Sequence, residues 1–86
     1  MRHCLQKHGL DQFFTHGTGH GVGLEIHERP TLSSNSEDTL MENMVVTVEP
    51  GVYIPGWGGI RIEDTVIVTK NGVEIITQSS KELLIL

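Results

Sequence analysis

Several residue types are scarce in this chain of 86 residues, and each scarcity excludes a class of protein. Cys4 is the single cysteine, so no intrachain disulfide can form, which fits a reducing compartment such as the cytoplasm. No apolar run approaches the about 18 residues that a membrane span needs, and no signal peptide is recognisable. Six basic residues against 11 acidic ones give a net charge of −5, which argues against a nucleic acid partner. We therefore expect a cytoplasmic protein with neither a membrane nor a nucleic acid as partner.

What is present describes one small domain. A hydrophobic content of 37% and a charged content of 20% are ordinary for a globular protein. A chain of this length buries only about 60–65% of its unfolded surface, so its stability is marginal without assistance. Residues 1–9 are expected to be the tail of a helix that ends at Gly9, so the sequence begins in mid-helix. This start predicts that the chain belongs to a longer protein.

Histidine is concentrated in one stretch, H-G-T-G-H-G-V-G-L-E-I-H-E, which spans residues 16–28 and holds three of the five histidines together with four glycines. The spacing excludes a dinucleotide-binding G-x-G-x-x-G, a zincin H-E-x-x-H and a phosphate-binding loop. A helix is disfavoured as well, because the four glycines oppose it by about 4 kcal/mol. In an extended chain His16 and His20 lie about 13 Å apart. We therefore expect one histidine to bind a ligand directly, and the glycines to allow a close backbone approach.

Two later segments complete a pattern. V-E-P-G-V-Y begins at Val48 and G-I-R-I-E-D-T-V begins at Gly59. In this order the three segments resemble the signature motifs of the Xaa-Pro aminopeptidases and prolidases, metallopeptidases of the pita-bread fold. The resemblance implies an α+β fold class, namely the C-terminal half of a pita-bread fold, mainly antiparallel sheet with a short N-terminal helix end. Residues 1–86 are then a C-terminal fragment of a metallopeptidase catalytic domain.

The resemblance also implies roles for individual residues. His20, Glu49 and Glu63 occupy the positions of three metal ligands, and His16 and His27 match residues that bind substrate and move protons around an Xaa-Pro bond. Arg61 matches an arginine that orients Glu63 or the substrate. Two divalent ions are implied for the whole enzyme, with manganese as our first choice and cobalt or zinc as alternatives.

The chain departs from the family in one respect. The family's two upstream aspartate ligands stand about eleven residues apart, whereas Asp11, Asp38 and Asp64 are separated by 27 and 26 residues. We therefore expect an Xaa-Pro metallopeptidase that needs its missing N-terminal half, acts on proline-containing peptides and is inactive as an isolated chain. The alternative is a catalytically inactive pita-bread-like module for binding or assembly. Apolar sheet surface left without the other half predicts a possible homodimer.

The remaining sequence predicts mostly strands. We expect a strand or strand entry over residues 11–15, a loop over residues 29–42 and a strand over residues 44–48 that continues to Ile54. A turn over residues 55–59 leads to one long strand over residues 60–69, and Asn71-Gly72 predicts a hairpin to residues 73–77. The result is an antiparallel meander.

This layout predicts a register. With residues 55–59 as the loop, Ile54 pairs with Ile60 and Gly51 pairs with Glu63. Glu49 then pairs with Thr65 and lies diagonally from Glu63 on the same face, about 7–8 Å away at the backbone. Two bare carboxylates at about 4 Å would repel by about 4 kcal/mol in a medium of dielectric constant about 20, and a cation would reverse that sign. Spacing alone equally allows Glu63 to pair with Arg61 and Glu49 to be a solvated strand end.

Overall fold

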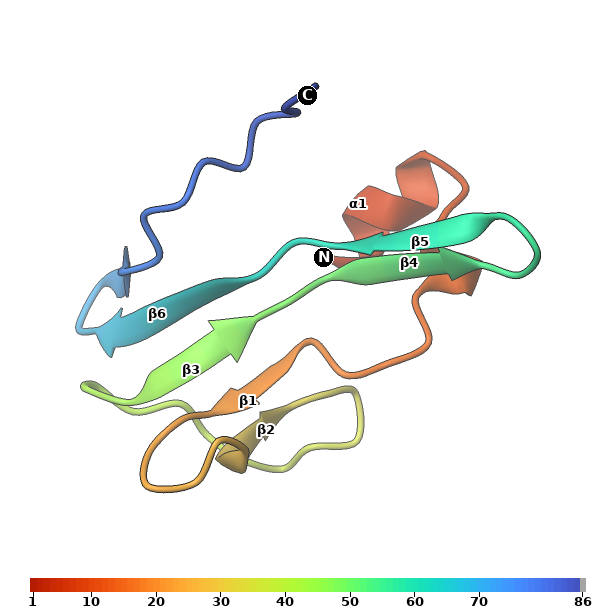
Figure 1. Ribbon diagram of the computed structural model, residues 1–86. Helices are drawn as coiled ribbons and strands as arrows, with labels where there is room; N and C mark the ends of the chain where they lie inside the picture. The colour runs from red at the N-terminus through yellow and green to blue at the C-terminus, as the bar shows by residue number, and fades with distance from the viewer. Residues whose placement is uncertain (86) are drawn as a thin grey trace.

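The chain folds into two antiparallel sheets preceded by a short helical segment (Figure 1). The computed structural model describes residues 1–85. The larger sheet has the strand order β2-β1-β3-β6-β7, and β4 and β5 form the smaller one. In chain order the elements are α1 Arg2–Lys7, a 3-10 turn Asp11–Phe13, β1 Gly19–Gly21, β2 Glu28–Leu32, β3 Val45–Val48, β4 Gly51–Ile54, β5 Gly58–Arg61, β6 Asp64–Thr69 and β7 Gly72–Ile75.

The N-terminal segment is helical, as expected, but the strand predicted after it is wrong. α1 ends at Lys7, and Gly9 takes a left-handed φ of 70°, a conformation that glycine adopts at little cost. Residues 11–13 form a 3-10 turn because the amides of Phe13 and Phe14 bond the carbonyls of Leu10 and Asp11. The chain becomes extended only at Phe14, whose side chain is buried.

The loop predicted over residues 29–42 is wrong at its start, where β2 lies. Within the described residues β2 is an edge strand that pairs with β1 alone, and its register shifts between His20 opposite Thr31 and Gly21 opposite Glu28. Pro30 sits in this irregularity, where its missing N–H costs no ladder hydrogen bond. A proline next to polar residues therefore predicted a loop where the structure has an edge strand.

One long twisted hairpin runs through both sheets (Figure 1). β3 continues into β4, and β5 continues into β6, so the single strand predicted over residues 60–69 is instead two strands. The ladder is interrupted at two residues on each side, Glu49-Pro50 and Ile62-Glu63, where the Ile62 amide bonds the Pro50 carbonyl at 3.1 Å. Because both sides skip the same number of residues, the register is the same before and after the gap.

The predicted register is wrong by two residues. Ile54 pairs with Gly58, and Gly51 pairs with Arg61, because the turn contains three residues and the Trp57 amide bonds the Ile54 carbonyl. A shift of two keeps every side chain on its predicted face, since side chains alternate with period two. Glu49 and Glu63 therefore come opposite one another across the gap, instead of diagonally.

The buried core is small. Phe14, Val46 and Val66 are its buried hydrophobic side chains among the described residues, and Thr47 is buried beside them. Large apolar side chains remain exposed on β5, on β7 and on the C-terminal segment that leaves the sheet in Figure 1, where Leu84 is 78% exposed. This exposed sheet surface agrees with the expectation from the sequence. Across residues 1–85 no helix combines the length and the apolar character needed to cross a membrane.

Candidate metal centre

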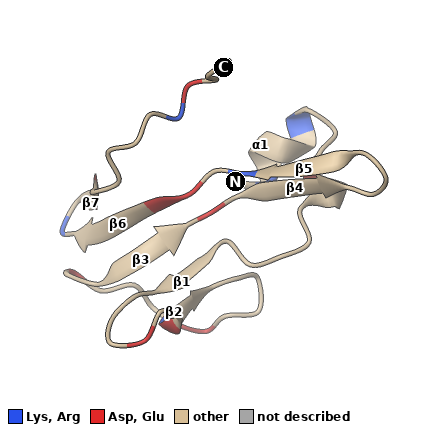
Figure 2. Cartoon of the chain, viewed as in Figure 1, with Lys and Arg blue, Asp and Glu red and all other residues tan. Residues whose placement is uncertain are grey.

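The gap in the long hairpin forms one side of a pocket. Figure 2 shows acidic segments where β3 leads into β4 and where β5 leads into β6. Here a pocket of about 380 Å³ lies open beside β1 and β3. Its lining residues are His20, Val22, Ile26, His27, Thr47, Glu49, Arg61, Glu63 and Thr65. Five of the six predicted site residues therefore line one pocket, and His16 does not.

β1 carries His20 to this pocket between two glycines that cannot be larger. A Cβ on Gly19 would overlap the Thr47 carbonyl of β3, and a Cβ on Gly21 would overlap the Arg29 carbonyl of β2. β1 is thus held tightly between its two neighbours in the sheet. The expected close backbone approach is present, and it brings the His20 ring toward β3.

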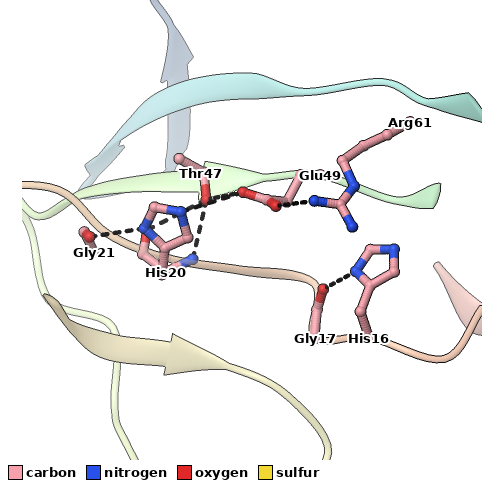
Figure 3. A network of polar contacts seen from close by, with 7 residues as sticks. All are labelled: His16, Gly17, His20, Gly21, Thr47, Glu49 and Arg61. Atoms are coloured by element: carbon pink, nitrogen blue, oxygen red, sulfur yellow. Dashed lines mark hydrogen bonds and ion pairs between the residues drawn. The ribbon is translucent and has the colours of Figure 1, made fainter. Parts of the chain in front are cut away.

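The His20 ring faces the carboxylate of Glu49 (Figure 3). Nδ1 lies 3.0 Å from the Gly21 carbonyl oxygen, and Nε2 lies 3.3 Å from Oε2 of Glu49. A carbonyl oxygen accepts only, so Nδ1 must carry the proton and donate. In the neutral ring Nε2 then presents a lone pair to a carboxylate oxygen. Two acceptors this close need a proton or a metal cation between them.

Glu49 is held by two further residues. The Thr47 hydroxyl donates to Oε2 of Glu49 at 2.8 Å, and Arg61 donates to Oε1 at 3.1 Å. The Glu49 side chain is only 12% exposed, whereas that of Arg61 is 39% exposed and lies over the Tyr53 ring. The alternative that spacing alone allowed, a pairing of Glu63 with Arg61, is not present in the described residues, because Arg61 pairs with Glu49. A carboxylate with this many donors is fixed in orientation.

The other two histidines differ in position. The His27 ring lies 4.2 Å from the His20 ring between centroids and lines the same pocket. His16 lies instead between Phe14 and Tyr53, beside Gly51, where an added Cβ would approach its Nε2 to 2.9 Å. Its Nε2 is buried without a hydrogen-bond partner in the described chain, and Nδ1 donates to the Gly17 carbonyl at 2.6 Å. Its ring lies on the Arg61 side of Glu49 (Figure 3).

The donor set fits a divalent cation in part. His20 offers a free lone pair and Glu49 a fixed carboxylate oxygen at the same point, which is the imidazole and carboxylate ligation that manganese, cobalt and zinc accept. Glu63 lines the pocket but makes no ion pair or hydrogen bond within residues 1–85. No group of three or more histidine, cysteine, aspartate or glutamate side chains in that part of the chain is close enough to hold a metal ion. The geometry brings two candidate ligands together and leaves the third on the pocket wall.

The sequence model of metallopeptidase family M24 matches residues 1–70. This chain belongs to that family. It is 52% identical over 83 residues to an Xaa-Pro dipeptidase of Pyrococcus furiosus, an alignment that covers 96% of this chain and 24% of the relative. The structure superposes on an Xaa-Pro dipeptidase from Bacillus anthracis with a TM-score of 0.95 and 56% identity, over 99% of this chain and 24% of that one.

The predicted fold class is confirmed, because the structural neighbours of this M24 chain are pita-bread prolidases. A more distant neighbour is an X-prolyl aminopeptidase from Caenorhabditis elegans, described as a cytosolic enzyme with a di-nuclear active site, with a TM-score of 0.73 and 36% identity. It covers 88% of this chain and 14% of that protein. This chain thus spans about a quarter of the length of the dipeptidases that it matches, 24% for those of Pyrococcus furiosus and Bacillus anthracis.

Sequence reasoning missed one residue that lines the candidate site, Thr47. It lies in the apolar strand V-V-T-V, where its neighbours are buried or half-buried valines. Its position two residues before Glu49 places both side chains on the same face of the chain, and this spacing was the available signal. The buried hydroxyl, not the apolar pattern, marks the face of β3 that lines the pocket.

Proposed function

We propose that this chain is part of the catalytic domain of an Xaa-Pro metallopeptidase, an aminopeptidase or dipeptidase that releases the N-terminal residue before proline. One observation carries the proposal. Nε2 of His20 lies 3.3 Å from the Glu49 carboxylate while Nδ1 lies 3.0 Å from the Gly21 carbonyl oxygen. A metal site explains this arrangement of two acceptors, and the family and the two dipeptidase relatives support the same reaction.

In this proposal His20, Glu49 and Glu63 hold divalent metal, two ions in the whole enzyme, with manganese as first choice and cobalt or zinc as alternatives. When bound, the metal supplies Lewis acidity and lowers the pKa of a bound water so that it becomes a nucleophile. Arg61 neutralises part of the charge of Glu49 and keeps its second oxygen away from the metal face. Glu49, held by Thr47 and Arg61, would present one oriented carboxylate oxygen to the cation.

The other two histidines of the motif, His16 and His27, act on substrate. His27 lies in the pocket beside His20, within reach of a group bound there, and is suited to accept or donate a proton near neutral pH. His16 lies outside the pocket, with an unpartnered Nε2 next to Gly51. A donor from a peptide can satisfy that nitrogen only after a small displacement of the ring, so we assign His16 to substrate binding and not to proton transfer.

The proposal also covers the rest of the molecule. The chain needs a further segment to supply the remaining metal ligands, and it is inactive without it. The enzyme works in the cytoplasm, and its exposed sheet surface is covered by the rest of the catalytic domain or by a second copy of the chain. The alternative function, an inactive module for binding or assembly, is disfavoured because a scaffold without catalysis has no need to keep His20 and Glu49 face to face.

A chimera tests the proposal. This chain replaces the segment of the Bacillus anthracis Xaa-Pro dipeptidase on which it superposes, and the purified protein is assayed with Mn²⁺ on Ala-Pro and on Ala-Ala. We expect Mn²⁺-dependent hydrolysis of Ala-Pro only. A folded chimera that hydrolyses neither peptide refutes the proposed function and favours the inactive module. Hydrolysis of Ala-Pro by the isolated 86-residue chain refutes its incompleteness.

A further inference from the structure

We propose that Thr47 is a positioning residue, whose hydroxyl sets the distance and orientation of the His20–Glu49 pair for a divalent cation. The inference rests on the proposed function, because it needs that pair to bind metal. Thr47 is 3% exposed, and it is the polar side chain among the buried residues of the described chain. A threonine hydroxyl so deep in a sheet must have partners, and its partners here are both halves of the candidate metal pair.

The hydroxyl joins two strands through one donor and one acceptor role. It accepts the backbone N–H of His20 at 3.0 Å and lies 2.8 Å from Oε2 of Glu49. The His20 carbonyl is also in range, but at 3.5 Å. Because the hydroxyl has one proton, the shorter contact to a charged acceptor takes it. Thr47 therefore ties the backbone of His20 to the carboxylate that its ring faces.

This bridge fixes which oxygen of Glu49 meets His20. Oε2 receives the Thr47 hydroxyl and faces Nε2 of His20, whereas Oε1 receives Arg61 (Figure 3). Without the hydroxyl the carboxylate can rotate, and Arg61 can take both oxygens as a bidentate partner. Glu49 would then remain near the cation, but its carboxylate would no longer be held in the orientation that binds it. Partners that orient metal ligands typically contribute about 10- to 100-fold in metal affinity or activity.

The spacing of the strands supports the same role. Gly19 lets β1 approach β3 so closely that a Cβ there would overlap the Thr47 carbonyl. At this separation the Thr47 hydroxyl reaches the His20 amide directly. The competing explanation is that Thr47 is a satisfied core threonine that only stabilises the sheet. The two explanations differ in what a variant that keeps the fold does to metal binding.

The experiment compares variants in the chimera described above. Thr47→Val keeps the shape of the side chain and removes the hydroxyl, Thr47→Ser keeps the hydroxyl, and Thr69→Val makes the same chemical change at an exposed position of β6 outside the pocket. Mn²⁺ affinity is measured from the electron paramagnetic resonance signal of free Mn²⁺, and kcat and KM are measured on Ala-Pro. The free energy of unfolding is measured for each variant in urea.

We expect Thr47→Val to weaken Mn²⁺ binding by about 10- to 100-fold and to lower kcat more than it changes KM. Thr47→Ser and Thr69→Val should retain the affinity of the unchanged chimera. Unchanged Mn²⁺ affinity in a folded Thr47→Val chimera overturns the inference. If Thr47→Val does not fold, Thr47→Ser and Thr47→Ala, which both lack the methyl, replace it as the comparison. Equal affinities in these two, or a folded Thr47→Ser beside an unfolded Thr47→Ala, assign Thr47 to stability alone.

Failure of the proposed function is a separate result. An unchanged chimera that binds Mn²⁺ but does not hydrolyse Ala-Pro refutes the peptidase, while the Mn²⁺ affinities of the variants still decide the role of Thr47. An unchanged chimera that binds no Mn²⁺ overturns both the metal assignment of His20 and Glu49 and the role of Thr47.

Discussion

Two carboxylates in this chain each meet an arginine, yet their surroundings differ. Asp38 accepts from Arg29 and from the Thr31 amide, and its own amide bonds the Ser36 hydroxyl. All these partners lie within nine residues of Asp38, on β2 or in the loop that follows it. Glu49 instead is surrounded by His20, Thr47 and Arg61, which come from β1, β3 and β5.

This difference separates local folding from function. Each carboxylate oxygen of Asp38 already accepts a hydrogen bond, one from Arg29 and one from the Thr31 amide. The ion pair therefore holds the loop after β2 against β2. Glu49 faces Nε2 of His20 at 3.3 Å, a contact between two acceptors that needs a proton or a metal cation. A carboxylate whose partners come from three distant elements, and include a second acceptor, indicates a candidate binding site. A carboxylate whose hydrogen bonds are all supplied by its sequence neighbours indicates a structural contact.

The largest expected effect comes from Gly19→Ala. The new Cβ would overlap the Thr47 carbonyl, so β1 must move away from β3, and the partners of Glu49 separate while those of Asp38 do not. We expect a loss of about 3 kcal/mol in the free energy of unfolding, at the upper end of overpacking effects. Urea denaturation measures it, and the nuclear magnetic resonance signals of the Asp38 loop report whether that region survives in the folded fraction.

Gly72→Ala is the matched control for this change. Nothing lies within 4 Å of a Cβ at Gly72, which begins β7. It should leave the free energy of unfolding unchanged or raise it by about 0.4–1 kcal/mol, through the lower entropy of the unfolded chain. Equal losses in the two variants would contradict the close packing of β1 against β3.

Glu49→Gln tests the functional half of the comparison. The amide keeps the shape and can still accept from Thr47, but it no longer offers a charge to a cation. In the chimera we expect Mn²⁺-dependent hydrolysis of Ala-Pro to fall by more than about 100-fold, beyond the effect of residues that only orient ligands. The free energy of unfolding should change by less than about 1 kcal/mol, as for a partly exposed ion pair.

Glu74→Gln, on the exposed strand β7, controls for loss of charge alone. Its hydrolysis rate should equal that of the unchanged chimera. Comparable rates for Glu49→Gln and Glu74→Gln would remove Glu49 from the metal site.

Asp38→Asn should show the opposite pattern. The neutral side chain loses its ion pair with Arg29, which is 84% exposed, and the loop after β2 becomes more mobile. We expect normal hydrolysis in the chimera, together with faster amide hydrogen exchange at Thr31 and faster proteolysis of residues 33–38. A loss of activity comparable to that of Glu49→Gln would show that the two carboxylates do not have separate roles.

The sequence predicted what depends on neighbours along the chain. Asn71-Gly72 gave the last hairpin, the β-branched run before Glu49 gave β3, and Gly9 gave the end of α1. Errors arose where distant pairing overrode local preference. Pro30 lies in an edge strand because β1 covers only one side of it, and the turn at residues 55–57 is shorter than its glycines indicated.

The site was predictable to the same extent. The motifs correctly predicted five residues that line one pocket, because a register error of two residues preserves the face of a strand. These are His20, His27, Glu49, Arg61 and Glu63. The motif could not tell that His16 lies outside the pocket or that Arg61 pairs with Glu49, because both depend on how β4 and β5 twist away from the larger sheet. The role of Thr47 was hidden for a similar reason, as its partner His20 is 27 residues away.

The smallest expected effect is a pH dependence confined to Asp38. Its hydrogen bonds from Arg29 and from the Thr31 amide lower the pKa of its carboxyl below the usual range in the folded chain. A group whose pKa is lower in the folded state stabilises that state fully at pH values above its unfolded pKa of about 3.9. The contribution is then lost as pH falls through the lowered folded pKa.

The Thr31 amide resonance should therefore stay constant above pH about 4 and shift only in more acidic solution, together with the carboxyl carbon of Asp38. In Asp38→Asn this step should be absent, while the sheet signals of β3 and β6 are unchanged. A Thr31 shift that begins above the usual range of an aspartate pKa would contradict the ion pair with Arg29. It would also remove the distinction between a carboxylate satisfied by its own loop and the Glu49 carboxylate at the candidate metal centre.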